Sequence, residues 1–224
     1  MYSPADPPTS VAPDPSAFTP AERRLIRALR TPLQVQRFLR AFPYNWAETL
    51  RTFRGVVSHG SAHCLEAVLF AATVLEQHGY PPLVLDLESR DKLDHVLFIY
   101  RRDGRWGSVG RSRDEGLHGR KPVFRTIGAL VRSYMDPYVD GAGRIVGYGT
   151  AHLDEIVRTD WRLGTRNMWS VEQALIRMPH HKVAMPQARY ARALQRFRAF
   201  KSATPSPSAR DWRRHLADQA HAWT

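Results

Sequence analysis

Gly60-Ser61-Ala62-His63-Cys64-Leu65-Glu66-Ala67 opens the most apolar segment of the chain and contains its only cysteine. Ser61 is a residue type that favours a helix N-cap, and Gly79, just before Pro81-Pro82, is typical of a helix end. The apolar residues between these positions would lie on nearly every side of a helix, which predicts that this helix is buried in the middle of its domain. With Ser61 as N-cap, Cys64 falls at the third helical position, within the first turn.

Strand patterns follow this central helix. Residues 83–87 and 95–100 are short apolar runs, and Asp103-Gly104 predicts a tight hairpin turn into a third strand through Trp106 and Val109. A helix followed by hairpin-connected strands indicates an α+β fold, with the cysteine-bearing helix packed on a small antiparallel sheet. Flanking helices are predicted at 20–30, from 32, at 48–53, at 126–134, within 161–178 and at 186–201, and an edge strand at 144–148.

The composition predicts one globular domain with short extensions. The chain has 224 residues and is 43% hydrophobic, which is enough for a sizeable core. Residues 1–19 form a Pro-rich leader that we expect to be disordered, residues 20–200 form the domain, and residues 201–224 form a linker and tail. One cysteine permits no intrachain disulfide, and neither a signal peptide nor a membrane-length apolar run is visible, so we expect a cytoplasmic protein without membrane insertion.

The net charge of +12 points to two kinds of surface. It could attract nucleic acid or an acidic partner, or it could be an ordinary solvated, arginine-rich surface. The arginines are scattered from Arg23 to Arg214 without a groove-reading motif, which favours the second interpretation. The predicted helix 186–201 has the same ambiguity, because its aromatic residues could contact a partner but at helical spacing are better explained by packing on the core.

Cys64 is the candidate nucleophile. At a helix start, unsatisfied N–H groups and the helix dipole favour the thiolate, and a nearby imidazole would lower the thiol pKa further. The competing interpretation is a small buried apolar side chain. An enzyme therefore predicts a reachable thiol of low pKa, and a binding module predicts an inert one.

His95 is the best candidate base among His59, His63, His78 and His95. His78 lies at the far end of the helix, whereas His59 and His63 belong to the same turn as Cys64 or precede it. His95 opens a strand, where a rigid sheet could hold it against the helix start. Strand alternation places His95, Leu97 and Ile99 on one face, which we expect to pack on the central helix.

These segments together resemble the transglutaminase-like (papain-like) superfamily of cysteine peptidases and acyltransferases. The family pattern has a cysteine opening a buried helix, a strand led by histidine, a short turn, and a strand with Trp before an acid. Here the matching pieces are the stretch 60–67, Asp94-His95-Val96-Leu97 and Asp103-Gly104-Arg105-Trp106, so the resemblance covers about residues 58–112. It implies a thiol enzyme that attacks a carboxamide or peptide bond of a protein or peptide through a Cys64 thioester, resolved by water or an amine. The helix-start N–H groups would contribute to an oxyanion hole.

The catalytic acid departs from the family pattern. The family's acid lies four residues after that Trp, and this position is Gly110, which cannot orient an imidazole. If the strand continued, Ser112 and Asp114 would share its face. We expect Asp114 to be the acid because its charge could hold a histidine tautomer, with Asp136 as an alternative. A dyad without an acid, or a degenerate domain that binds an acidic partner or nucleic acid, remains open.

A zinc site is the main alternative chemistry. His59, His63, Cys64 and His95 are suitable ligand types, but no Cys-x-x-Cys or His-Glu-x-x-His motif accompanies them. We therefore expect no metal and no cofactor. His180-His181 is interpreted as a solvated loop pair.

Overall fold

The computed structural model describes residues 12–113, 115–139 and 143–203. Within these residues a five-stranded antiparallel sheet has the order β3-β2-β1-β4-β5. The strands are β1 (Leu83–Ser89), β2 (His95–Arg102), β3 (Arg105–Val109), β4 (Ile145–His152) and β5 (His181–Lys182). The predicted α+β class and the antiparallel sheet are confirmed.

Eight α-helices lie in the described residues. They are α1 (Pro20–Ala28), α2 (Pro32–Ala41), α3 (Phe53–His59), α4 (Cys64–Glu76), α5 (Ile127–Tyr138), α6 (Leu153–Ile156), α7 (Trp169–Arg177) and α8 (Gln187–Ala203). Short 3-10 helices, η1 (Pro15–Ala17) and η2 (Glu115–Leu117), complete the set. The helix predicted at 48–53 is wrong, because the Thr52 hydroxyl caps the N–H of Gly55 at 3.4 Å and α3 begins only at Phe53.

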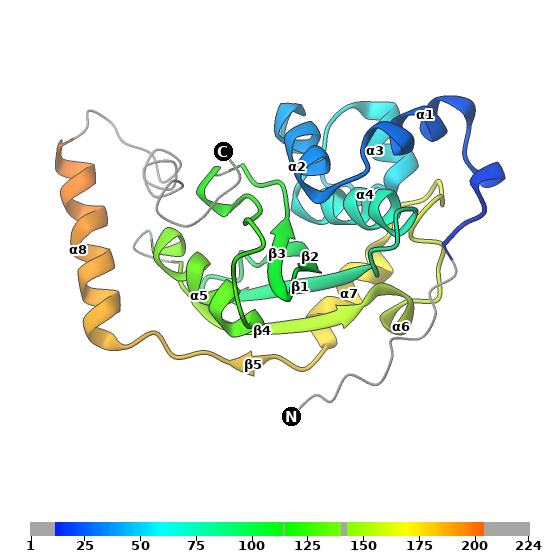
Figure 1. Cartoon of the computed structure of the whole chain (residues 1–224). Coiled ribbons are helices and arrows are strands. Elements are labelled where there is room, and N and C mark those ends of the chain that lie inside the picture. Colours follow the sequence, from blue (N-terminus) through cyan, green and yellow to red (C-terminus); the bar gives the residue numbers. More distant parts are fainter. Residues whose placement is uncertain (1–11, 114, 140–142, 204–224) are drawn as a thin grey trace.

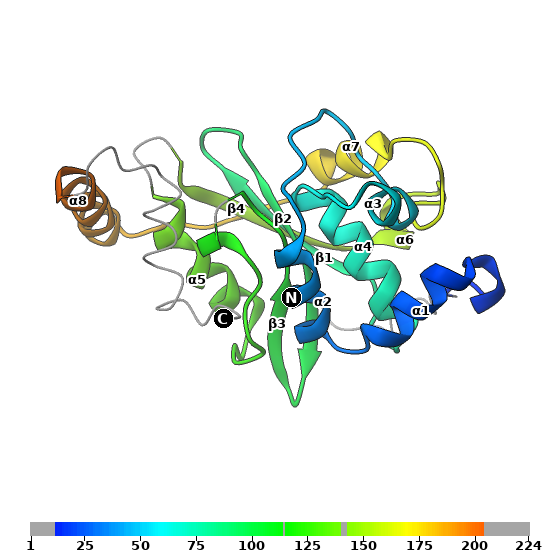
Figure 2. The same ribbon diagram turned by 90° about the horizontal axis from the view of Figure 1, so that it is seen from above.

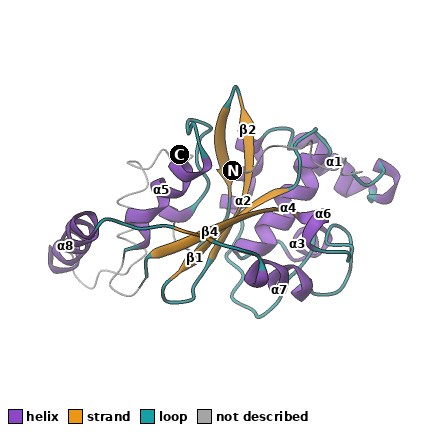
Figure 3. Cartoon of the chain, turned by 90° about the horizontal axis from the view of Figure 1, so that it is seen from below, coloured by secondary structure: helices purple, strands orange, loops and turns teal. Residues whose placement is uncertain are grey.

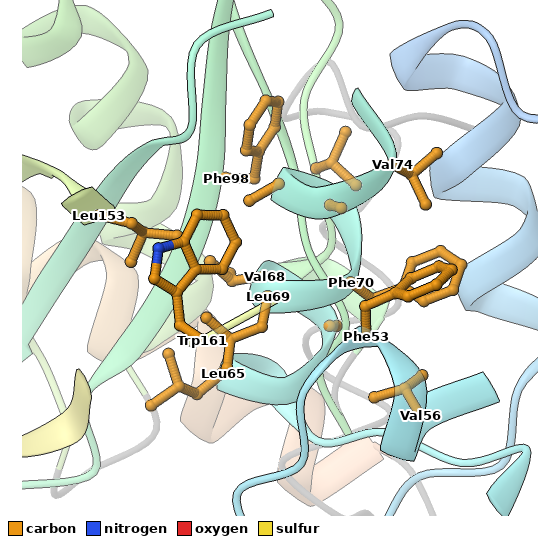
Figure 4. Packing of buried hydrophobic residues seen from close by; sticks show 14 of the residues in the cluster. Phe53, Val56, Leu65, Val68, Leu69, Phe70, Val74, Phe98, Leu153 and Trp161 are labelled. Carbon is orange, nitrogen blue, oxygen red and sulfur yellow. The ribbon is translucent and has the colours of Figure 1, made fainter. Parts of the chain in front are cut away.

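Both faces of the sheet are covered by helices. Helices α1 to α4, α6 and α7 lie on one side and α5 lies on the other (Figures 1, 2 and 3). The larger core forms around α4, where Phe53, Phe98 and Trp161 pack with the apolar residues of the helix, Phe70 among them (Figure 4). The smaller core forms between the opposite sheet face and α5. The sheet is therefore a central layer between two cores.

The predicted face of His95 is wrong. Leu97 and Ile99 share its parity, but they pack in the α5 core, whereas Val96 and Phe98 pack in the α4 core. Every residue from His95 to Tyr100 is buried, so both faces of this strand are covered. The sequence therefore has no polar face that would show which side packs against α4.

The cysteine-bearing helix starts later than predicted. Its N-cap is His63, not Ser61, and Cys64 is the first helical residue. The side chains of His63 and Glu66 form a reciprocal capping box, so His63 takes the N-cap position that was predicted for Ser61. Every residue from Leu65 to Glu76 is buried, which confirms that this helix is central.

The packed part of the chain begins before the expected boundary at residue 20. Phe18 is 1% exposed and meets Phe53 edge-to-face, and the Gln77 side chain donates to the Pro13 carbonyl at 2.9 Å. The leader predicted over 1–19 is therefore too long at its C-terminal end, since residues 13–19 are anchored by these contacts. Residues 1–11 and 204–224 lie outside the described residues.

At the other end, α8 is attached to α5 through Asp136, which accepts from Arg189 at 2.7 Å and from Arg196 at 2.8 Å. None of the helices in the described ranges is long and apolar enough to cross a bilayer.

Candidate functional site

Cys64 and His95 line one cavity of about 150 Å³ at the end of the sheet. Helix α4 supplies Cys64 at its first turn, and β2 supplies His95 at its first residue. The remaining wall is formed by Tyr44, Asp91, Leu93, Asp94, Ser112, Arg113, Leu117 and Tyr138. The structure thus brings together two of the three predicted catalytic residues. The third, Asp114, lies outside the described residues, although the preceding Arg113 lines the cavity.

The thiol of Cys64 is not the pre-formed thiolate expected from its place at a helix start. Burial of the thiol raises its pKa to about 11, although the residue as a whole keeps partial exposure. The backbone N–H groups of Val96 and Leu65 donate to Sγ and lower the pKa, while the carboxylate of Asp86 raises it. Desolvation therefore outweighs the helix-start N–H groups, and the resting thiol is protonated at neutral pH.

His63 is a structural cap and not a base for Cys64. Its Nδ1 accepts from the N–H of Leu65 at 3.2 Å, and its Nε2 donates to the carbonyl of Thr49 at 2.6 Å. Both ring nitrogens are thus used to join the helix start to the preceding loop. This role explains why the residue next to Cys64 is a histidine without assigning it any chemistry.

The side chain of Glu66 joins the same helix turn to the preceding loop. It is fully buried and accepts from the Thr49 hydroxyl at 2.7 Å, from Asn45 at 2.9 Å and from the Arg51 N–H at 3.0 Å. A buried carboxylate is stable only when donors of this kind replace its hydration. The loop 45–51 is therefore locked onto the helix turn that holds Cys64.

The imidazole of His95 is oriented by the backbone. Its Nε2 lies 2.8 Å from the carbonyl oxygen of Leu117, and the ring is 4% exposed. A carbonyl oxygen only accepts, so Nε2 carries a proton and the lone pair of the neutral ring resides on Nδ1. The carbonyl of Leu117 thereby performs the orienting task for which we expected an acidic side chain.

Gly110, at the family's acid position, does lie beside the imidazole. A Cβ there would be 3.9 Å from His95 Nε2 and would overlap Leu97 Cδ2, so any larger residue would have to displace the end of the Leu97 side chain. The buried side chain of Gln36 holds this backbone, donating to the Gly110 carbonyl at 2.9 Å and accepting from the Gly110 N–H at 2.9 Å. Both backbone polar groups of Gly110 are thus held by one side chain.

Arg120 positions the loop that carries the Leu117 carbonyl. Its buried guanidinium donates to the carbonyls of Gly116 at 2.6 Å and His118 at 2.8 Å, on either side of Leu117. It also stacks over the ring of Tyr134, whose hydroxyl donates to the His118 carbonyl at 3.0 Å. Sequence reasoning missed this support, because a backbone acceptor has no residue type that would signal it.

The alternative acid Asp136 belongs elsewhere, since its two carboxylate oxygens accept from Arg189 and Arg196. A different carboxylate, Asp86 on β1, lies near Cys64 and accepts from His180 Nε2 at 2.9 Å. Burial raises the pKa of Asp86 to about 6, while the His180 hydrogen bond lowers it. The interpretation of His180 as solvated is therefore wrong, because it is bound to a buried acid.

Two of the histidines considered as zinc ligands form hydrogen bonds with the backbone. His59 is exposed and its Nδ1 donates to the Gly55 carbonyl at 2.9 Å, and His63 binds the backbone as described. Within the described part of the chain, no group of three or more His, Cys, Asp or Glu side chains is arranged to hold a metal ion.

Comparisons with known proteins add nothing to this geometry: no protein-family model matches the chain, and no curated protein matches it either. The functional argument therefore rests on the cavity and its residues.

Proposed function

We propose that the chain is a transglutaminase-like thiol enzyme that cleaves or transfers a carboxamide or peptide acyl group. The observation that carries the proposal is that Cys64 and His95 line one cavity while the Leu117 carbonyl holds His95 in the tautomer with a basic Nδ1. A nucleophile, a base and a group that orients the base are the parts that covalent acyl chemistry requires.

The high thiol pKa defines how Cys64 would be activated. Because the resting thiol is protonated, His95 Nδ1 would take the proton as Sγ attacks the substrate carbonyl carbon, as in a serine triad and unlike a thiolate–imidazolium pair. The new C–S bond gives a tetrahedral intermediate. Imidazolium then protonates the leaving amine, the C–N bond breaks, and the thioester is resolved by water or by an amine.

The developing oxyanion would be stabilised at the start of α4. The N–H of Leu65 is shared between His63 Nδ1 and Cys64 Sγ, so the N–H of Cys64, at the first helical position, is the proposed donor. The positive end of the helix dipole favours negative charge at this place. We also propose a cytoplasmic location, because the single cysteine permits no intrachain disulfide.

A degenerate domain that binds an acidic partner or nucleic acid is the second candidate. Two observations favour it: the raised pKa of Cys64, and a glycine where the family has its acid. This candidate predicts a thiol that reacts slowly and independently of His95.

Acylation of Cys64 by p-nitrophenyl acetate, followed by intact-mass spectrometry, separates the two candidates. The enzyme should form S-acetyl-Cys64, Cys64→Ala should not, and His95→Gln should acylate about 100-fold or more slowly, the usual loss when a general base is removed. Release of ammonia or peptide amine from a glutamine-containing peptide mixture would then test carboxamides directly.

His181→Ala is the matched control, because His181 is exposed on β5 and lies outside the cavity. It should acylate at the wild-type rate, and circular dichroism should show that each variant is folded. Acylation that is equally slow in wild type and His95→Gln would overturn the enzyme proposal.

A further inference from the structure

Another cavity, of about 330 Å³, is lined by α3, the loop before it and the segment 164–167. Three arginines, Arg51, Arg54 and Arg166, line it together with His59, Thr52 and Ser58. No carboxylate of the described residues lines it, and it shares no lining residue with the cavity of Cys64 and His95. It is therefore a separate site of positive charge and hydrogen-bond donors.

The two walls of this cavity are joined by direct hydrogen bonds. The Thr52 hydroxyl donates to the Gly164 carbonyl at 2.8 Å, and the N–H of Leu50 donates to the Asn167 side chain at 2.9 Å. The N–H of Met168 in turn donates to the carbonyl of the same residue, Leu50, at 2.7 Å. Segments more than a hundred residues apart in the chain are thus held in register, so the cavity is already formed.

The arginines differ in how far their charge is neutralised. Arg54 is paired with Glu22 through two bonds, at 2.8 and 3.0 Å. Arg51 donates to the Ser61 hydroxyl at 3.2 Å, and its nearest carboxylate, on Glu66, is 3.9 Å away and already accepts several other bonds. Arg166 is exposed and makes no ion pair within the described residues. Among the described residues, the charge of Arg166 at the cavity therefore has no carboxylate partner.

Packing around α3 also keeps Arg51 in place. A Cβ at Gly55 would come within 2.8 Å of Arg51 Cβ, so glycine at this helical position leaves the space that the arginine stem occupies. A partly buried arginine held in one position loses little conformational entropy when it binds an anion.

We infer that this cavity binds the phosphate group of a small phosphorylated molecule. Three guanidinium groups around one cavity offer more donors than the two oxygens of a carboxylate can accept, and they match the several acceptor oxygens of a phosphate. The volume is at the lower end of small-molecule sites, and the net charge of +12 would favour the approach of an anion.

Isothermal titration with inorganic phosphate and with adenosine 5′-monophosphate, at about 0.15 M salt to screen non-specific attraction, tests the site. Both should bind with a stoichiometry of one. Arg166→Gln should weaken binding about tenfold or more, the usual effect of losing a charged hydrogen bond. Because Arg166 is exposed, its replacement should leave the fold intact.

Arg101→Gln is the matched control, since Arg101 is an exposed arginine near the end of β2 that does not line this cavity, and its loss changes the net charge equally. It should bind both probes as the wild type does. Equal weakening by the two substitutions, or no binding of either probe at millimolar concentration, would overturn the inference. A single-stranded oligonucleotide that alone binds, with both variants weakened alike, would identify a diffuse nucleic-acid surface and would also overturn it.

Discussion

At Cys64, the local helix start and the surrounding protein act on the thiol in opposite directions. The N–H groups of Val96 and Leu65 favour the thiolate, but desolvation and the charge of Asp86 favour the neutral thiol and bring the pKa to about 11. Position along a helix therefore describes only part of the electrostatics of a cysteine. The deciding contribution comes from what the fold places around it.

Replacing Asp86 with Asn should lower the thiol pKa. A carboxylate near a thiolate raises the cost of the second negative charge, so its removal should make alkylation of Cys64 by iodoacetamide at pH 8 faster, by about threefold or more. The rate-against-pH profile should shift toward lower pH, while burial keeps the pKa above that of a free cysteine. Asparagine can still accept from His180, which preserves the local geometry.

Asp103→Asn serves as the control, because Asp103 is exposed at the tip of the β2–β3 hairpin. It should leave the alkylation profile unchanged. An unchanged profile in Asp86→Asn would show that Asp86 does not act on the thiol.

At the scale of elements, one side chain on α2 ties together the strand end and the loop that flank His95. Gln36 is fully buried and satisfies the Gly110 N–H and carbonyl as well as the Gly119 N–H, the last at 3.1 Å. Three backbone groups from the region after β3 thus depend on one amide. This arrangement holds the backbone at Gly110 in its contact with the imidazole.

Gln36→Ala should destabilise the fold by about 3 kcal/mol, because it leaves these backbone groups buried without partners. Urea unfolding followed by circular dichroism measures the change. Arg37→Ala, one residue along the same helix and exposed, should stay within about 0.5 kcal/mol of the wild type. A loss of similar size in both variants would show that the cost does not arise from the hydrogen bonds of Gln36.

At the scale of the whole molecule, the sheet joins two cores that share its strands. Phe98 packs in the α4 core and the adjacent Ile99 packs in the α5 core, and both are almost completely buried. A strand cannot lose one face without losing the backbone that supports the other. The two cores should therefore unfold as one cooperative unit.

Phe98→Ala should cost about 3–5 kcal/mol and Ile99→Ala about 2–5 kcal/mol, each in a single transition. Tryptophan fluorescence, which reports Trp161 in the α4 core and Trp106 beside the α5 core among the six tryptophans, and far-ultraviolet circular dichroism, which reports all elements, should give the same midpoint in each variant. Two separate transitions in Ile99→Ala, seen by either probe, would show that the α5 side unfolds independently.

Local signals in the sequence determined the secondary structure well. Capping boxes at Thr19 and Thr31 set the starts of α1 and α2, and Asp103-Gly104, with φ of 50° and 72°, turns the hairpin as predicted. The all-round apolar pattern of residues 65–76 determined that α4 is central. Each of these features depends on residues close together in the chain, so a local pattern is enough to predict it.

Only the tertiary structure decided how the candidate site works. The sequence proposed Cys64 and His95 as a pair, but the face of β2, the protonated thiol, the Leu117 carbonyl in place of an acid, and the role of Gln36 depend on segments that are distant in the chain. A backbone carbonyl is present at every residue and therefore leaves no mark in the sequence. Desolvation likewise depends on the neighbours that the fold brings together, which no spacing along the chain encodes.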